Sequence, residues 1–139
     1  MKSALASLAL ATLFCTFILA GEKSQLKDDP RVAKDNAVYV EPANKDADVA
    51  IVEEIQKWGR WRVVADETEA HIIVRLRASG SGAWGLGHIQ AFILDAKTKE
   101  TIWTSKNQKG TRNIFHGYAS PFRRAAEGIV KQMKKVLGD

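Results

Sequence analysis

The chain is short, mildly basic and nearly free of cysteine, and these properties exclude several classes of protein. It has 139 residues, a formal net charge of +5 at pH 7 and one cysteine. That length suits one domain with one hydrophobic core. The positive charge is smaller and less clustered than nucleic-acid-binding proteins usually show. With a single cysteine, the chain has no internal disulfide framework.

The amino terminus has the three parts of a secretory signal peptide. Lys2 supplies a positive charge, residues 4–19 are uncharged and mostly apolar, and the small residues Ala20 and Gly21 follow. The chain then turns abruptly polar. We therefore expect residues 1–20 to be a signal peptide that is cut between Ala20 and Gly21, which would leave a periplasmic or secreted protein.

Two other fates of this segment stay open. Retention would anchor the protein in a membrane, although a spanning helix needs about 20 apolar residues and this run is shorter. Acylation at Cys15 would make a lipoprotein, but Phe14 stands where that processing needs a small residue. Cleavage after Ala20 removes Lys2 and Cys15. It leaves no thiol, and 20 basic against 16 acidic residues give a net charge of +4.

Residues 21–36 are charged, poor in large apolar side chains and interrupted by Pro30, so they are predicted to form a polar linker. Residues 37–139 then form a single domain. Its first strand is predicted at 37–42. A helix follows and ends before Gly59, because apolar residues recur with helical spacing. These residues are Ile51, Val52, Ile55 and Trp58.

Four further strands and a closing helix are predicted. The strands lie at 61–65, 70–78, 88–95 and 100–105, and successive hairpins among them indicate an antiparallel meander. The closing helix begins at Ser120-Pro121, a favourable cap and first residue, and ends at Gly138. This order predicts an α+β domain of two layers, in which two helices cover one face of an antiparallel sheet of four to five strands.

Short motifs in this order resemble the amino-terminal domain of the TolB family and related periplasmic domains of bacterial envelope assembly lipoproteins. The motifs are Trp58-Gly59, the strand 61–64, the segment 69–76 before a glycine-rich turn, and the strand-turn-strand 91–103. His71 replaces an acidic residue of that family, and Lys99 replaces its turn glycine. The resemblance covers 37–137 and implies a non-catalytic accessory or interaction role. No binding residue transfers with it.

Motifs for catalysis, cofactors and metals are incomplete. Residues 80–85 (GSGAWG) match the glycine pattern of a dinucleotide-binding loop, but a predicted strand follows instead of a helix. The histidines His71, His88 and His116 have no metal-ligand spacing, and the acidic turn 66–69 lacks the glycine of a calcium loop. We therefore expect no enzymatic activity, no nicotinamide or flavin cofactor and no bound metal.

Strand parity predicts two different faces of the sheet, because successive side chains point to opposite sides. One set is apolar and is expected under the helices: Trp61, Val63, Ile72, Val74, Leu76, Ile89, Ala91 and Ile93. The other face mixes arginine with aromatic residues, which together can pair with and stack on a partner. The candidate partner-binding residues are Arg60, Arg62, Arg75, Arg77 and Phe92, with Trp84 in the glycine-rich loop.

Three functions remain open at this stage. The first is an exported, non-catalytic interaction module that binds a protein partner in the cell envelope. The second is binding of an anionic polymer or of lipid headgroups through the arginine-bearing face. The third is a small secreted hydrolase, which would need a carboxylate pair or a Ser/His pair in one pocket. The alternative to the first two is an ordinary solvated face on which arginine stems cover apolar neighbours.

Overall fold

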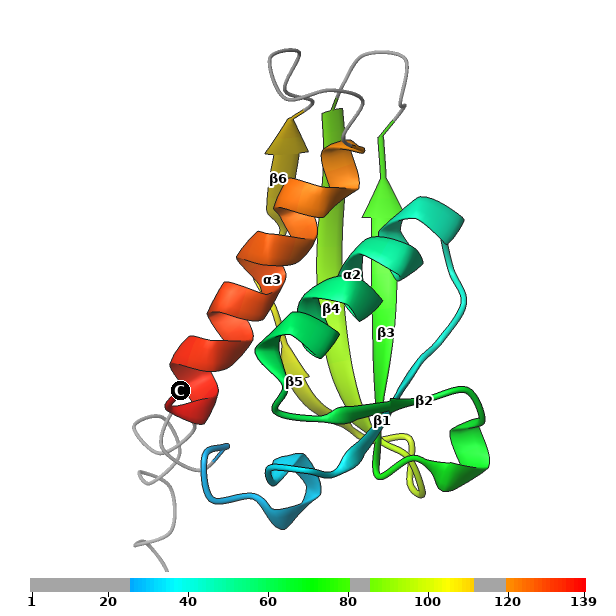
Figure 1. Cartoon of the computed structure of the whole chain (residues 1–139), viewed down its shortest axis with the longest axis vertical. Helices are drawn as coiled ribbons and strands as arrows, with labels where there is room; N and C mark the ends of the chain where they lie inside the picture. Colours follow the sequence, from blue (N-terminus) through cyan, green and yellow to red (C-terminus); the bar gives the residue numbers. More distant parts are fainter. Residues whose placement is uncertain (1–25, 81–85, 112–119) are drawn as a thin grey trace, which may run out of the picture.

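The computed structural model describes residues 26–80, 86–111 and 120–139, which form a six-stranded sheet and two long helices (Figure 1). The strands are β1 (Ala37–Val40), β2 (Arg62–Val64), β3 (Ile72–Ser79), β4 (Leu86–Asp95), β5 (Thr101–Thr104) and β6 (Gln108–Thr111). The long helices are α2 (Lys45–Trp58) and α3 (Pro121–Leu137), and two 3-10 turns are η1 (Pro30–Val32) and η2 (Glu67–Glu69). The predicted α+β architecture is confirmed.

The sheet is mixed, whereas the sequence predicts a wholly antiparallel one. Its order is β2-β1-β3-β4-β5, and β1 runs parallel to both of its neighbours. The two hairpins β3-β4 and β4-β5 are antiparallel, as expected. β6 also pairs with β4, beyond the stretch that pairs with β5. This strand lies between the predicted strand 100–105 and the closing helix, where no strand is predicted, because its sequence QKGT has no alternating apolar residues.

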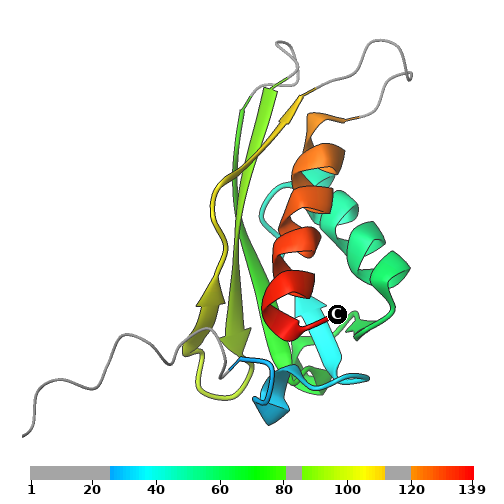
Figure 2. The same cartoon turned by 90° about the vertical axis from the view of Figure 1, so that its left-hand side faces the viewer.

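Both helices cover the same face of the sheet, and Figure 2 shows the two layers edge-on. The apolar residues predicted under the helices all belong to this core or pack against it. The Asn44 side chain caps α2 by accepting from the backbone N–H groups of Asp46 and Ala47. Gly59, with φ 70°, ends α2 in the left-handed conformation that glycine adopts at little cost.

Residues 26–36 pack against the domain, although the sequence predicts a polar linker there. Leu26 and Val32 are buried in the core, and the Trp61 indole N–H donates to the Val32 carbonyl at 3.1 Å. The Asp29 carboxylate caps η1 and accepts hydrogen bonds from the Arg31 guanidinium, which also contacts Asp95. Two apolar side chains and one ion-pair cluster therefore hold this charged segment against the rest of the domain.

Glycines let α3 approach the sheet closely. A Cβ atom at Gly110 of β6 would lie 1.9 Å from the Pro121 carbonyl oxygen and 2.9 Å from the Ala125 nitrogen. At Gly87 of β4 it would meet the Phe122 ring at 3.0 Å. The backbone of β6 therefore lies directly against the first turns of α3, in a gap too narrow for any side chain.

Gly110→Ala should destabilise the domain because its methyl group would collide with helix backbone, which cannot rotate away. We expect a loss of about 1–3 kcal/mol, the usual cost of overpacking, and a lower Tm by circular dichroism. Gly128→Ala is the matched control. The three atoms nearest to its methyl group, at 2.3–2.7 Å, all belong to the Gln108 side chain and none to backbone, and alanine favours the helix by about 1 kcal/mol. Equal Tm values for the two variants would contradict this account of the α3 contact.

Asp29→Asn should remove acid-sensitive stability, since hydrogen bonds from Arg31 lower the pKa of Asp29 in the folded chain. A carboxyl group whose pKa is lowered by folding stabilises the fold above its unfolded pKa, and this contribution disappears as pH falls through the folded pKa. Urea denaturation should show the variant weaker by about 1 kcal/mol at pH 7. The difference should vanish between roughly pH 5 and pH 1. A difference independent of pH would show that the Arg31 interaction is not its source.

Candidate functional site

The described helices leave the second face of the sheet uncovered (Figure 2). We call it the open face. Cross-strand registers place its residues in rows, because partners on adjacent strands point to the same side. In strand order the open face includes Arg62 and Val64 of β2, Tyr39 of β1 with the following Glu41, Ile73, Arg75, Arg77 and Ser79 of β3, Leu86, His88, Gln90, Phe92 and Leu94 of β4, Thr101 and Thr104 of β5, and Lys109 and Thr111 of β6.

One row of the open face is apolar. Tyr39 pairs with Val64 on one side and with Ile73 on the other, and Ile73 pairs with Leu94. Ile73 and Leu94 are only 1% and 2% exposed, yet neither belongs to the core under the helices. An ion pair between Lys99 and Glu67 joins the β4-β5 turn to η2 at this end of the sheet. The row therefore forms a small second apolar cluster that supports the open face.

Arg75 lies in the next row, directly opposite Phe92. Its Nε and Nη2 atoms both donate to the Glu41 carboxylate, which follows β1. These hydrogen bonds lower the pKa of Glu41, so the carboxylate stays ionised and neutralises Arg75. The Arg75 side chain is 49% exposed. Arg75 and Glu41 thus form a solvent-accessible ion pair at the edge of the apolar row.

Arg77 lies one row further along β3, and its guanidinium carbon is 5.5 Å from the centre of the Phe92 ring. This distance permits a cation–π contact, which holds the guanidinium over the ring. No carboxylate among the described residues lies within ion-pair distance of Arg77. His88 and Lys109 are opposite each other in a neighbouring row. We call Arg77, Phe92, His88 and Lys109 the basic patch.

The predicted binding residues do not all lie together. Arg75, Arg77 and Phe92 are neighbours, whereas Arg62 begins β2 opposite Ala37, at the far end of the open face. Trp84 lies outside the described residues, as do Ala20 and Gly21 of the expected cleavage site.

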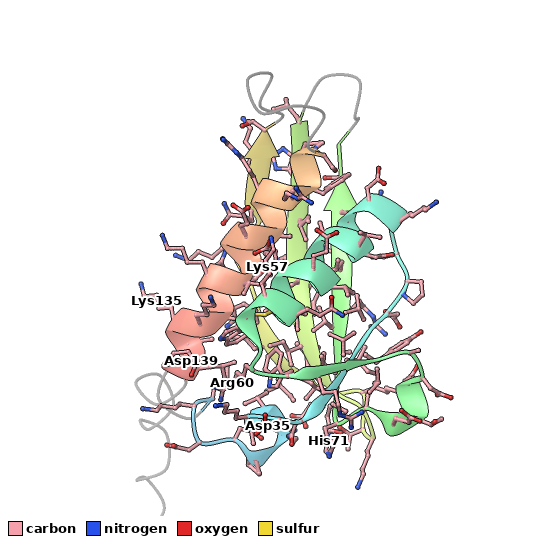
Figure 3. The ribbon with its side chains drawn as sticks, viewed as in Figure 1. Asp35, Lys57, Arg60, His71, Lys135 and Asp139 are labelled. Carbon is pink, nitrogen blue, oxygen red and sulfur yellow. The ribbon has the colours of Figure 1, made fainter. Side chains whose placement is uncertain are left out.

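Arg60 forms hydrogen bonds within the fold and is not part of the open face. Its Nη1 atom donates to both Asp139 side-chain oxygens at 2.8 and 2.9 Å, and Nε and Nη2 donate to the Val32 carbonyl at 3.3 Å. The side chain is 10% exposed, and Figure 3 shows Arg60 and Asp139 close together at one end of the domain. Gly59 redirects the chain just before Arg60, so strand parity does not extend to this residue.

Glu41, Tyr39 and Lys109 belong to the open face but are absent from the predicted binding residues. Tyr39 and Glu41 have the alternation of an extended chain, and only the parallel pairing of β1 beside β3 places them next to Ile73 and Arg75. Lys109 requires β6, which has no apolar alternation. Sequence periodicity therefore identifies the arginines but not the carboxylate that neutralises one of them.

Among the residues that the structure describes, the open face holds no assembled catalytic group. Ser79 and His88 are opposite each other on β3 and β4, but no hydrogen bond joins their side chains in the described structure. A serine nucleophile requires a base within hydrogen-bond reach and a third group that orients that base. His71 has a structural contact, because its Nδ1 atom accepts from the Ala37 backbone N–H at 3.0 Å.

In the described ranges, no three His, Cys, Asp or Glu side chains gather closely enough to hold a metal ion. Within those ranges, neither long helix has the length and apolar character needed to cross a bilayer.

The chain is similar to several solved structures. TolB from Acinetobacter baumannii is 10% identical with a TM-score of 0.49, over 75% of this chain and 28% of TolB. The PelC dodecamer from Paraburkholderia phytofirmans is 11% identical with a TM-score of 0.46, over 78% and 91% of the respective chains. The LpoB carboxyl-terminal domain from Salmonella enterica is 12% identical with a TM-score of 0.46, over 64% and 92%.

No protein family matches the sequence, and no curated protein sequence is significantly similar to it. TolB, whose family the sequence motifs resemble, is among the solved structures that the chain is similar to. At 10–12% identity these similarities assign no residue of the open face a role.

Proposed function

We propose that the chain is an exported, non-catalytic binding protein whose open face takes an acidic segment of a partner protein in the cell envelope. The observation that carries this proposal is the basic patch. Arg77 is held over Phe92 with no carboxylate beside it among the described residues, and Lys109 and His88 lie close by. An exposed guanidinium fixed on an aromatic ring offers both an ion pair and a flat contact area.

A protein partner suits this surface better than a long polymer. The basic patch has two permanent cations, Arg77 and Lys109, and the one other arginine near it among the described residues is neutralised by Glu41. A polymer site usually neutralises many successive phosphates or sulfates along a groove. Phe92 and Tyr39 are half-buried and add aromatic surface, which is typical of protein interfaces.

Photo-cross-linking in the cell tests this proposal. A photoreactive amino acid in place of Gln90, on the open face, should cross-link the chain to one partner protein. The cross-link should lie in an acidic segment of that partner. The same photoreactive amino acid in place of Gln56, which is exposed on α2, should not form this cross-link. Arg77→Glu should abolish the Gln90 adduct, since it reverses the charge that attracts the partner, while leaving Tm within a few degrees. An adduct at Gln90 that survives Arg77→Glu would show that the basic patch is not the binding site.

Binding of an anionic polymer is the second candidate. On this face Glu41 neutralises Arg75, which would otherwise add a further cation to such a site. Glu41→Gln should release Arg75 and raise the salt concentration needed for elution from heparin. The salt slope of binding should steepen by about one, which corresponds to one additional ionic contact. Glu69→Gln, at an exposed site in η2, removes the same charge without freeing an arginine and serves as the control. Identical elution of both variants would exclude Arg75 as a polymer contact.

A further inference from the structure

A second group of cations gathers at the carboxyl-terminal end of α3, on the helical side of the domain. Lys131, Lys134 and Lys135 lie in its last two turns, and Figure 3 shows Lys135 pointing outward from the helix. The Lys27 side chain lies against Gly138, and Lys34 lines a shallow hollow of about 250 Å³ together with Trp58, Gly59, Arg60 and Asp139. We call these five lysines the cationic end.

The carboxylates around the cationic end do not cancel its charge. Glu127 is exposed one turn before Lys131 on α3 but forms no ion pair in the described structure. Asp139 is already engaged by the Arg60 guanidinium and by the Trp58 indole N–H at 3.0 Å. The exposed Asp28 and Asp35 are chain neighbours of Lys27 and Lys34 and offset those two lysines. No ion pair is formed by Lys131, Lys134 or Lys135 within the described ranges. The surplus charge is therefore concentrated on α3.

Trp58 adds an amphipathic side chain to the cationic end, with an apolar ring and a polar N–H group. Its indole is partly buried, packs against Trp61 at 5.1 Å between ring centres, and has the Lys134 ammonium 6.0 Å from its own ring centre. Indole rings with one wet edge, flanked by lysines whose stems cover apolar surface, are typical of proteins at a membrane interface. The hollow beside Trp58 is bounded by charged groups.

The described part of the chain begins at the same end of the domain. The described residues begin at Leu26, and the neighbouring Lys27 contacts the end of α3. Five residues, 21–25, separate Leu26 from the apolar segment, and five extended residues reach at most about 18 Å. Retention of the apolar segment in a membrane, one of the alternatives to cleavage, would therefore keep the cationic end within reach of the lipid headgroups.

We propose that the cationic end rests on an anionic lipid surface. Its lysines are flexible point charges spread over a convex helix, a form that suits mobile headgroups better than the defined geometry of a protein carboxylate. The proposal does not depend on the function proposed for the open face. α3 and the open face lie on opposite sides of the sheet, so both surfaces can be occupied at once (Figure 2).

Vesicle sedimentation tests the proposal with the processed protein, exported from the full-length chain and purified without its signal segment. All described core residues lie between Leu26 and Leu137, so this form retains the described core. It should sediment with vesicles of equal parts phosphatidylglycerol and phosphatidylcholine, but not with phosphatidylcholine alone. Each lysine near an anionic surface contributes on the order of fivefold to affinity. Lys131→Gln/Lys135→Gln should therefore weaken binding about 25-fold.

Two double variants serve as controls. Lys45→Gln/Lys97→Gln removes the same charge from the start of α2 and the β4-β5 turn and should bind vesicles almost as tightly as the unaltered protein. Arg75→Gln/Arg77→Gln, on the open face, should also retain vesicle binding, even if it loses the partner protein. The proposal is overturned if the unaltered protein ignores anionic vesicles, or if the three double variants weaken binding equally. It is also overturned if the Lys131→Gln/Lys135→Gln variant no longer binds an acidic protein but still binds the anionic vesicles.

Discussion

The close contact of α3 with β4 and β6 is the constraint on which the rest of the structure depends. Gly110 leaves no room for a side chain against the first turns of α3, and Gly87 leaves room only for the Phe122 ring. The apolar stripe of α3 is thereby fixed on one face of the sheet, next to that of α2. Two consequences follow. The lysines of α3 remain on the outer side of the helix, and the second face of the sheet stays uncovered by either long helix.

That second face is stable without a covering helix because of its own side chains. Ile73 and Leu94 are buried there although they lie outside the core, in a row flanked by the Arg75–Glu41 and Lys99–Glu67 ion pairs. Long charged side chains can cover apolar neighbours with their methylene stems while the charged ends stay in water. Arg75 therefore contributes to the structure through its ion pair with Glu41, in addition to any binding role. Arg77 differs from Arg75 in this respect, because it contacts an aromatic ring and no carboxylate of the described chain.

Sequence periodicity was sufficient for the helices and for most strands, because amphipathic repeats and strand alternation both reflect burial on one side. It could not give the position of β1 between β2 and β3, since parallel pairing leaves no local signal in the chain. It also missed the docking of residues 26–36, where Leu26 and Val32 are isolated apolar residues in a charged segment. Lys99 is a further residue whose backbone conformation the sequence does not indicate. It adopts φ 62°, a conformation that favours glycine, and the turn still forms.

In the candidate site, too, local alternation predicts some features and long-range contacts decide the others. Alternation along β3 and β4 places Arg75, Arg77 and Phe92 on one face, and the registers confirm that they are neighbours. Alternation fails at Arg60, because a left-handed glycine precedes it and its partner Asp139 is 79 residues away. Long-range ion pairs of this kind decide which arginines remain available to a partner. Arg60 fixes the end of α3 to the core, Arg75 is held by Glu41, and Arg77 is left to solvent and Phe92. The binding capacity of the open face therefore depends less on how many arginines it carries than on which of them already have a carboxylate.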